Sequence, residues 1–220
     1  MALEVIDRLD SVKRDFRTVL ILGSDFGLLQ PELAHRGLAV TVADPGCRVA
    51  SASGGIQCDE DFLPFERATF DIIIALGTLD TVDDLPGALI QIRRLLTPDG
   101  LLLGAMMGAG SLSLIKAILA EELPGSAHAH PQIDVRATGD LLARAGFALP
   151  VADCETVTVR YSRFSRLVSD LRANGQSNVL TSRRNFSRAS FARTAERFDM
   201  SDRRECFALL YMTGWAPSVK

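Results

Sequence analysis

The stretch Val19-Leu20-Ile21-Leu22-Gly23-Ser24-Asp25-Phe26-Gly27 begins as a buried strand and ends in a turn that contains glycine. A helical stretch follows, and then a second strand that ends in Asp44-Pro45. In a strand–helix–strand unit of this order, the turn lets the backbone approach a ligand, and the acid accepts hydrogen bonds from ribose hydroxyls. We therefore predict a nucleotide site that includes Gly23, Ser24, Asp25, Gly27, Asp44 and Pro45.

Two features of this segment leave a purely structural alternative open. Asp25 stands where such a turn usually has glycine, so its side chain would crowd a ligand and place a negative charge at the helix N-terminus. Asp44-Pro45-Gly46 is also a good turn sequence, in which Asp44 would cap the turn. The segment is thus either a binding site or an ordinary connection between a strand and a helix.

The remaining chain alternates between strand-like and helix-like segments. Phe70–Leu76 is an apolar, β-branched run fit for a strand buried on both faces, and Leu85–Leu96 has helical spacing. Thr97–Gly100 predicts a turn before another strand, Leu101–Met107. This alternation predicts an α/β fold with a doubly wound, mostly parallel sheet. Leu76-Gly77-Thr78 then follows a strand at the end where such sheets bind ligands, so its backbone is expected to contact a ligand, although a plain turn fits equally well.

The length of 220 residues fits one domain with a well-buried core. Leu3, Ile6, Leu9 and Val12 recur at helical spacing and predict an N-terminal helix over residues 1–17. We divide the expected domain into a cofactor-binding half, 18–110, and a substrate or partner half, 111–220.

Composition excludes several classes of protein. With 47% hydrophobic and 23% charged residues and no apolar run near 18 residues, we expect neither disorder nor a membrane span. The first residues carry acids and have no signal-peptide core, so we expect a cytoplasmic protein. The four cysteines have no paired spacing, and we expect them to be small core residues and not metal ligands.

Charge is distributed unevenly along the chain. Residues 1–150 hold 12 Lys/Arg against 20 Asp/Glu, whereas residues 151–220 hold 12 against 7. The arginine-rich C-terminal part predicts an acidic protein or carrier partner, with solvated helix faces as the alternative. Nucleic acid is not expected, because the whole chain is acidic and has few aromatic residues.

Taken together, these segments resemble the class I S-adenosylmethionine-dependent methyltransferases over nearly the whole chain. The resemblance implies a seven-stranded sheet with an antiparallel C-terminal strand, S-adenosylmethionine as cofactor and Asp44 as the ribose-binding acid. Cys58-Asp59-Glu60-Asp61-Phe62-Leu63-Pro64-Phe65 resembles the segment that contacts adenine, which implies Asp59 and Glu60 as cofactor-binding residues. No catalytic residue is named, because methyl transfer depends mainly on the positioning of the reacting groups.

Further segments, such as Asp84–Leu89 and Leu141–Phe147, resemble one branch of this family. That branch contains the malonyl-carrier-protein methyltransferase of biotin synthesis and the mitochondrial complex I assembly arginine hydroxylase, so the fold does not fix the reaction. The sequence departs from the branch pattern at Ile21, Asp25 and Asp80-Thr81, and it has a short N-terminus. We carry three hypotheses: a methyltransferase acting on a protein or a carrier-bound acid, a cofactor-free scaffold or assembly factor, and a protein arginine hydroxylase.

Overall fold

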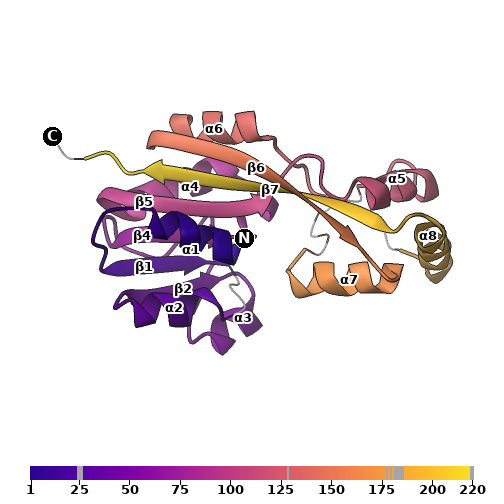
Figure 1. Ribbon diagram of the computed structural model, residues 1–220, viewed down its shortest axis with the longest axis horizontal. Coiled ribbons are helices and arrows are strands. Elements are labelled where there is room, and N and C mark those ends of the chain that lie inside the picture. The colour runs from indigo at the N-terminus through magenta and orange to yellow at the C-terminus, as the bar shows by residue number, and fades with distance from the viewer. Residues whose placement is uncertain (24–26, 128, 177, 179, 181–185, 219–220) are drawn as a thin grey trace. The chain divides into compact units, whose positions relative to one another are not determined.

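The computed structural model describes residues 1–23, 27–127, 129–176, 178, 180 and 186–218. Over these residues the chain forms a seven-stranded sheet in the order β3-β2-β1-β4-β5-β7-β6 (Figure 1). The strands are β1 (Thr18–Leu22), β2 (Ala39–Asp44), β3 (Ile56–Gln57), β4 (Phe70–Leu76), β5 (Leu96–Met107), β6 (Ala148–Arg160) and β7 (Arg204–Trp215). The helices are α1 (Ala2–Asp10), α2 (Leu29–His35), α3 (Cys47–Ala52), the 3-10 helix η1 (Leu79–Thr81), α4 (Leu85–Leu95), α5 (Ser113–Glu122), α6 (Val135–Arg144), α7 (Phe164–Ala173) and α8 (Arg188–Met200).

The residues group into two compact units. Unit 1 comprises Met1–Met106, Asp134–Asp153 and Leu210–Lys220, and unit 2 comprises Met107–Ile133 and Cys154–Leu209. Neither unit is continuous in sequence. The prediction of a single domain with two halves stays a prediction.

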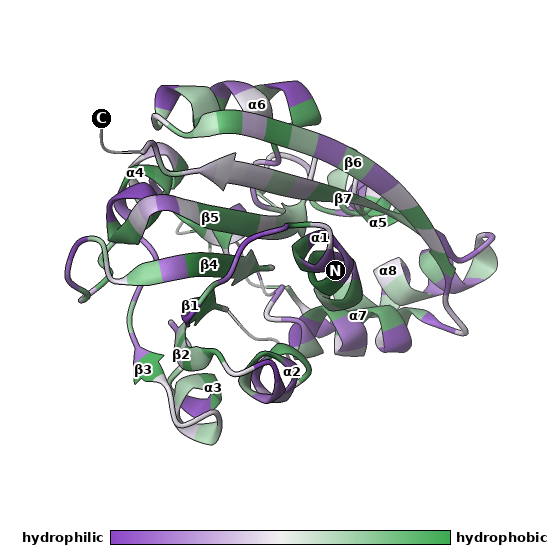
Figure 2. Cartoon of the chain, turned by 60° about the vertical axis from the view of Figure 1, so that its left-hand side comes forward, coloured by the Kyte–Doolittle hydropathy of each residue, from purple (hydrophilic) through white to green (hydrophobic). Residues whose placement is uncertain are grey.

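Parallel strands form the centre of unit 1. β1 pairs in parallel with β2 and with β4, and β4 pairs in parallel with β5. The side chains from Val19 to Leu22 and from Ile72 to Ala75 are at most 1% exposed. Burial on both faces explains why these strands read as uninterrupted apolar runs. By contrast, the last part of β6, Val157–Arg160, alternates between apolar and polar residues (Figure 2), as expected for a strand at the end of the sheet.

The predicted fold class is confirmed. The sheet is mixed and mostly parallel, and the arrows of β6 and β7 point in opposite directions (Figure 1). β7 lies between β5 and β6 although it follows both in sequence. Helices connect β1 to β2, β2 to β3 and β4 to β5, as the alternating sequence pattern predicts, whereas residues 58–69 lead from β3 to β4 without a helix.

The predicted N-terminal helix is too long. α1 ends at Asp10, and the chain from Ser11 runs without helix to β1. The backbone N–H groups of Arg17 and Thr18 donate to the Asp71 carboxylate at 2.8 and 3.1 Å. Burial raises the pKa of Asp71, but these bonds and those from the Thr97 and Thr18 hydroxyls outweigh it and hold the pKa below its usual value. Asp71 therefore fixes an extended approach to β1 that helical spacing does not reveal.

The turn predicted at Thr97–Gly100 is instead an irregular start of β5. Phe70 pairs with Leu96 and Ile72 with Leu101, so β5 carries extra residues opposite β4. Asp99 has φ of 58°, the left-handed conformation typical of a bulge or turn. Turn-forming residues here bend a strand without ending it.

In unit 2, helices pack around one buried acid and one aromatic cluster. Glu205 is fully buried, and its carboxylate accepts hydrogen bonds from the backbone N–H groups of Leu114 and Ile115 at 3.1 and 2.9 Å. Because these groups belong to the first turn of α5, Glu205 stabilises the start of that helix. Phe164 contacts Phe191 and Phe198 with ring centroids 5.2 and 5.6 Å apart, joining α7 to α8.

The prediction that the cysteines are core residues is wrong: Cys47 and Cys154 are exposed, and Cys58 and Cys206 are half-buried. Within the described part of the chain, no helix combines the length and apolar character needed to cross a bilayer.

Candidate functional site

The strand register brings the predicted site residues of β1, β2 and β4 to one edge of the sheet, which we call the carboxyl edge. Leu22 pairs with Ala43 on one side and with Ala75 on the other. The next residue of each strand is therefore Gly23, Asp44 or Leu76, and the three form a row across neighbouring strands. Gly23 is central in this row, and its N–H donates to the Ala43 carbonyl at 3.0 Å.

Gly23 is required by both conformation and packing. Its φ is 86°, and a Cβ atom there would lie 2.4 Å from the Leu76 carbonyl oxygen and 3.0 Å from Thr78 Cβ. Gly27 also has a positive φ, 73°, but a Cβ atom there would meet nothing within 4 Å. Ser24 and Asp25, which lie between them, are outside the described residues. Gly23 therefore brings bare backbone against the end of β4.

Asp44 serves as a turn cap, and its carboxylate retains free acceptor capacity. Its side chain is 7% exposed, and Oδ1 accepts a hydrogen bond from the Gly46 N–H at 2.7 Å. No other hydrogen bond to this carboxylate occurs among the described residues. Burial raises the pKa of Asp44, and the Gly46 bond opposes that shift. Asp44 therefore does cap the turn, and its Oδ2 atom still has the acceptor chemistry that a ribose hydroxyl needs.

The segment after β3 reaches the same edge. Gln57 pairs with Asp44 across β2 and β3, the Cys58 N–H donates to the Asp44 carbonyl at 3.4 Å, and the Gln57 side chain donates to the Pro45 carbonyl at 3.1 Å. Asp59, the predicted adenine contact, is exposed, whereas Glu60 is 7% exposed. The segment therefore presents one solvated and one buried acid.

Glu60 is the most perturbed acid of this edge. Burial, together with the charges of Asp44, Asp59 and Asp61, raises its pKa to about 7, although a hydrogen bond from its own backbone N–H opposes the shift. Burial and the same acids, Glu60 first among them, raise the pKa of the Cys58 thiol. Such a cluster favours ligands that bring hydrogen-bond donors or positive charge.

The end of β4 adds backbone groups and the side chain of Thr78, the last residue of the predicted segment Leu76-Gly77-Thr78. The Gly77 N–H donates to the Ala105 carbonyl at 2.8 Å, and Gly77 has φ of 60° with open space around its Cβ position. Thr78 is buried, and its side chain packs against Gly23. Its place directly after Leu76-Gly77 was the only signal in the sequence.

Two positions that depart from the family pattern have clear environments. Ile21 is fully buried in β1, where it pairs with Val42 and Ile74. Asp80 lies in η1, a short helix that begins two residues beyond Gly77. The side chain of Ile21 adds no polar group to the carboxyl edge.

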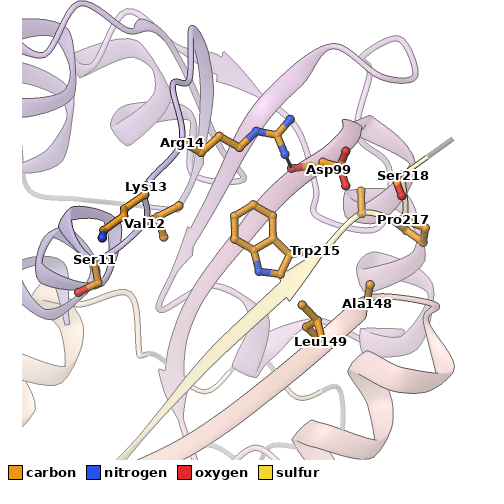
Figure 3. Close-up of a pocket in the computed structure, with 11 residues that line it drawn as sticks. Ser11, Val12, Lys13, Arg14, Asp99, Ala148, Leu149, Trp215, Pro217 and Ser218 are labelled. Atoms are coloured by element: carbon orange, nitrogen blue, oxygen red, sulfur yellow. Dashed lines mark hydrogen bonds between the residues drawn. The ribbon is translucent and has the colours of Figure 1, made fainter.

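A separate cavity of about 850 Å³ lies at the opposite, amino edge of the sheet (Figure 3). Trp215 and Leu149 contribute apolar side chains, and the Arg14 guanidinium donates to the Asp99 carbonyl beside the indole. Asp99 is in the irregular start of β5, whereas the predicted site follows the ends of parallel strands. This cavity is therefore not the predicted nucleotide site.

Comparison with known proteins agrees with this geometry. Residues 2–150 match a family described as a methyltransferase domain. The chain is 33% identical to the mitochondrial arginine-hydroxylase NDUFAF5 of Danio rerio over 97% of this chain and 73% of that protein. It is 30% identical to malonyl-[acyl-carrier protein] O-methyltransferase 1 of Coxiella burnetii, over 80% of this chain and 62% of that protein.

A solved structure supports the fold alone. Phosphoethanolamine N-methyltransferase 2 of Haemonchus contortus, in complex with S-adenosyl-L-methionine, superposes with a TM-score of 0.57 at 17% identity. The match covers 99% of this chain and 52% of that one. Since the sheet order, the glycine turn and the sequence match all agree, the chain belongs to the methyltransferase domain family and has the fold of the S-adenosylmethionine-dependent methyltransferases.

Proposed function

We propose that the protein binds S-adenosylmethionine at the carboxyl edge and transfers its methyl group to a protein side chain or a carrier-bound acid. One observation carries the proposal: the register places Gly23, Asp44 and Leu76 in a row on three neighbouring parallel strands. Gly23 lets the backbone come close, Asp44 offers an acceptor for the ribose, and Glu60 with Asp59 lies beside it. Catalysis would then rest on holding the methyl group in line with its acceptor.

The charge of unit 2 supports a protein partner with an acidic surface. Unit 2 holds 12 Lys/Arg against 8 Asp/Glu, whereas unit 1 holds 12 against 19. Arg193 and Arg197 pair with Glu121 and Glu122, so they are partly neutralised. Arg163, Arg172 and Arg188 are exposed and have no ion pair among the described residues. An acidic carrier protein matches this surface, and one relative acts on a malonyl-[acyl-carrier protein] by its name.

Two other functions have a specific observation in their favour. A cofactor-free scaffold is favoured by Ile21, whose buried side chain supplies no polar contact, and by Asp25 in the turn. Arginine hydroxylation is favoured by the 33% identity to an arginine-hydroxylase. Mass spectrometry of a partner protein incubated with this protein distinguishes the reactions, since hydroxylation adds one oxygen and methylation adds one methyl group. A scaffold would leave the mass of the partner unchanged.

Calorimetric titration with S-adenosylmethionine and S-adenosylhomocysteine tests the cofactor proposal, after mass spectrometry has checked for ligand retained through purification. We expect micromolar binding, about −8 kcal/mol. Asp44→Asn should weaken it at least tenfold, because an amide offers a poorer acceptor for two ribose hydroxyls. Asp140→Asn, which makes the same change at an exposed residue of α6, is the matched control and should bind S-adenosylmethionine normally. Absence of heat and of thermal stabilisation at millimolar ligand would favour the scaffold.

Charge reversal tests the partner proposal. Arg163→Glu and Arg172→Glu should weaken binding of an acidic acyl carrier protein, and the wild-type affinity should fall with added salt, because exposed charges are screened beyond about 8 Å at physiological ionic strength. Arg136→Glu, an exposed change in unit 1, is the control. Affinity that responds neither to salt nor to these changes would contradict an electrostatic docking surface. Arg183 and Arg184, also part of the predicted surface, lie outside the described residues.

A further inference from the structure

The Glu60 side chain is buried with one carboxyl oxygen unpaired, although its carboxyl group takes a hydrogen bond from its own backbone N–H. It is 7% exposed, and its Oε1 atom has no solvent contact and no hydrogen-bond partner in the described structure. Glutamate is rarely buried unless paired, since a buried polar atom without a hydrogen-bond partner loses its interaction with water and gains nothing in return. An unpaired carboxyl oxygen beside the carboxyl edge indicates that this oxygen forms its hydrogen bond with the ligand.

The surroundings of Glu60 make its charged form unfavourable. The charges that act on it are all negative. They belong to Asp44 at the end of β2 and to the adjacent Asp59 and Asp61. The Cys58 thiol, the other titratable group nearby, is coupled to the same acids. No Lys or Arg of the described residues enters this set. With a pKa of about 7, the carboxyl is close to half protonated at neutral pH.

We infer that Glu60 is a protonation switch of the cofactor site, and that its carboxyl group gives up a proton when the site takes up a cationic ligand that donates hydrogen bonds. This inference rests on the proposed function. The step is a proton transfer only: the carboxyl O–H bond breaks, the proton leaves to solvent, and the carboxylate oxygen accepts a hydrogen bond from an N–H of the ligand. S-adenosylmethionine has a sulfonium, an ammonium and an aromatic amine, so it brings both the charge and the donors.

The direction of the pH effect follows from linkage. The ligand stabilises the charged carboxylate and lowers the pKa of Glu60 in the complex, so binding releases a proton wherever the free carboxyl is protonated. Affinity therefore rises as pH increases through about 7 and then levels off. About one pH unit below that value, binding should be roughly tenfold weaker than at its plateau.

The test is calorimetric titration of the full chain with S-adenosylmethionine at about pH 5.5 and about pH 7, each in two buffers of different ionisation enthalpy. Both pH values lie below the range in which the amino group of the ligand titrates. For the wild type we expect at least roughly tenfold tighter binding at the higher pH, with release of close to one proton per ligand at the lower pH and about half a proton at the higher. Glu60→Gln should remove both the affinity difference and the proton release. Glu66→Gln, which makes the same change at an exposed glutamate outside this cluster, is the matched control and should keep both.

Several outcomes would overturn the inference. Equal affinity at both pH values without proton release, or a pH dependence that survives in Glu60→Gln, would refute it and leave the cofactor proposal standing. No binding at either pH would refute both. If Glu60→Gln does not fold, carbon-13 NMR titration of labelled glutamate carboxyls in the wild type decides, because absence of any glutamate titrating near neutrality contradicts the switch.

Discussion

Gly23 is a residue where packing and backbone conformation both exclude a side chain. We expect Gly23→Ala to destabilise the protein by about 3 kcal/mol, because a Cβ atom would overlap the Leu76 carbonyl and the residue would be held at positive φ. Gly37→Ala is the control: its φ is 83°, but its Cβ would have open space, so only the conformational cost of about 1 kcal/mol remains. Urea unfolding measures both, and equal losses would contradict the role assigned to packing.

Glu60 makes the stability of the protein depend on pH in a predictable direction. Because its pKa is raised from 4.5 to about 7 in the folded protein, the folded state loses stability relative to the unfolded chain as pH rises through that interval. Glu60→Gln has no charge to bury, so its free energy of unfolding does not fall in this way. The difference in free energy of unfolding between the variant and the wild type should therefore be about 2 kcal/mol more in favour of the variant at pH 8 than at pH 5. Urea unfolding at both pH values is the measurement. A gap between the two proteins that does not change with pH would show that the carboxyl titrates normally.

At the scale of elements, one arginine attaches α1 to the sheet of unit 1. Arg8 donates to both oxygens of Asp153 at 2.7 and 2.8 Å, pairs with Glu4, and lies over the Tyr211 ring at 4.7 Å. The hydrogen bonds to Asp153 raise the pKa of Arg8 further, so it is charged at every working pH.

Arg8→Met should therefore destabilise the protein by about 2 kcal/mol and speed hydrogen exchange within α1. The control is Arg166→Met, which removes a 65% exposed arginine with a single 3.4 Å contact to Asp170 and should change stability by less than about 0.5 kcal/mol. Unchanged exchange in α1 would mean that apolar packing of Val5 and Leu9 suffices to dock the helix.

Most elements could be predicted from the sequence because their signals are local. β4 is Phe70–Leu76 in both prediction and structure, since a short, β-branched apolar run is typical of a strand buried on both faces. The end of α1 and the start of β5 could not be predicted in this way. They depend on Asp71 and on pairing with β4, which are contacts between segments far apart in the sequence.

The strand ends that form the site could be predicted from the sequence, whereas the directions of its side chains could not. Gly23, Asp44 and Leu76 follow strands that were recognised, so their meeting at one edge could be inferred. That Glu60 is buried and Asp59 is solvated could not, because side-chain direction after a two-residue strand has no periodic signal. Asp25, the residue that most affects the cofactor hypothesis, lies outside the described residues.

At the scale of the whole molecule, the two compact units differ in the sign of their net charge. Unit 1 carries the carboxyl edge and an excess of acids, while unit 2 carries the excess of arginine. Relatives of this chain are named for different reactions: one is a methyltransferase and another is a hydroxylase. The fold therefore supports a binding proposal, and only measurements on the site can assign the chemistry.

The chain contains a single tryptophan, Trp215, and its position at the amino-edge cavity makes it a spectroscopic reporter of a defined region. Its indole is half-buried beside Val12 and Arg14, which follow α1. Emission excited selectively at the indole should shift to longer wavelength in Arg8→Met, where the end of α1 loosens. The same emission should stay constant while ligand fills the opposite edge, so one optical signal separates helix undocking from cofactor uptake.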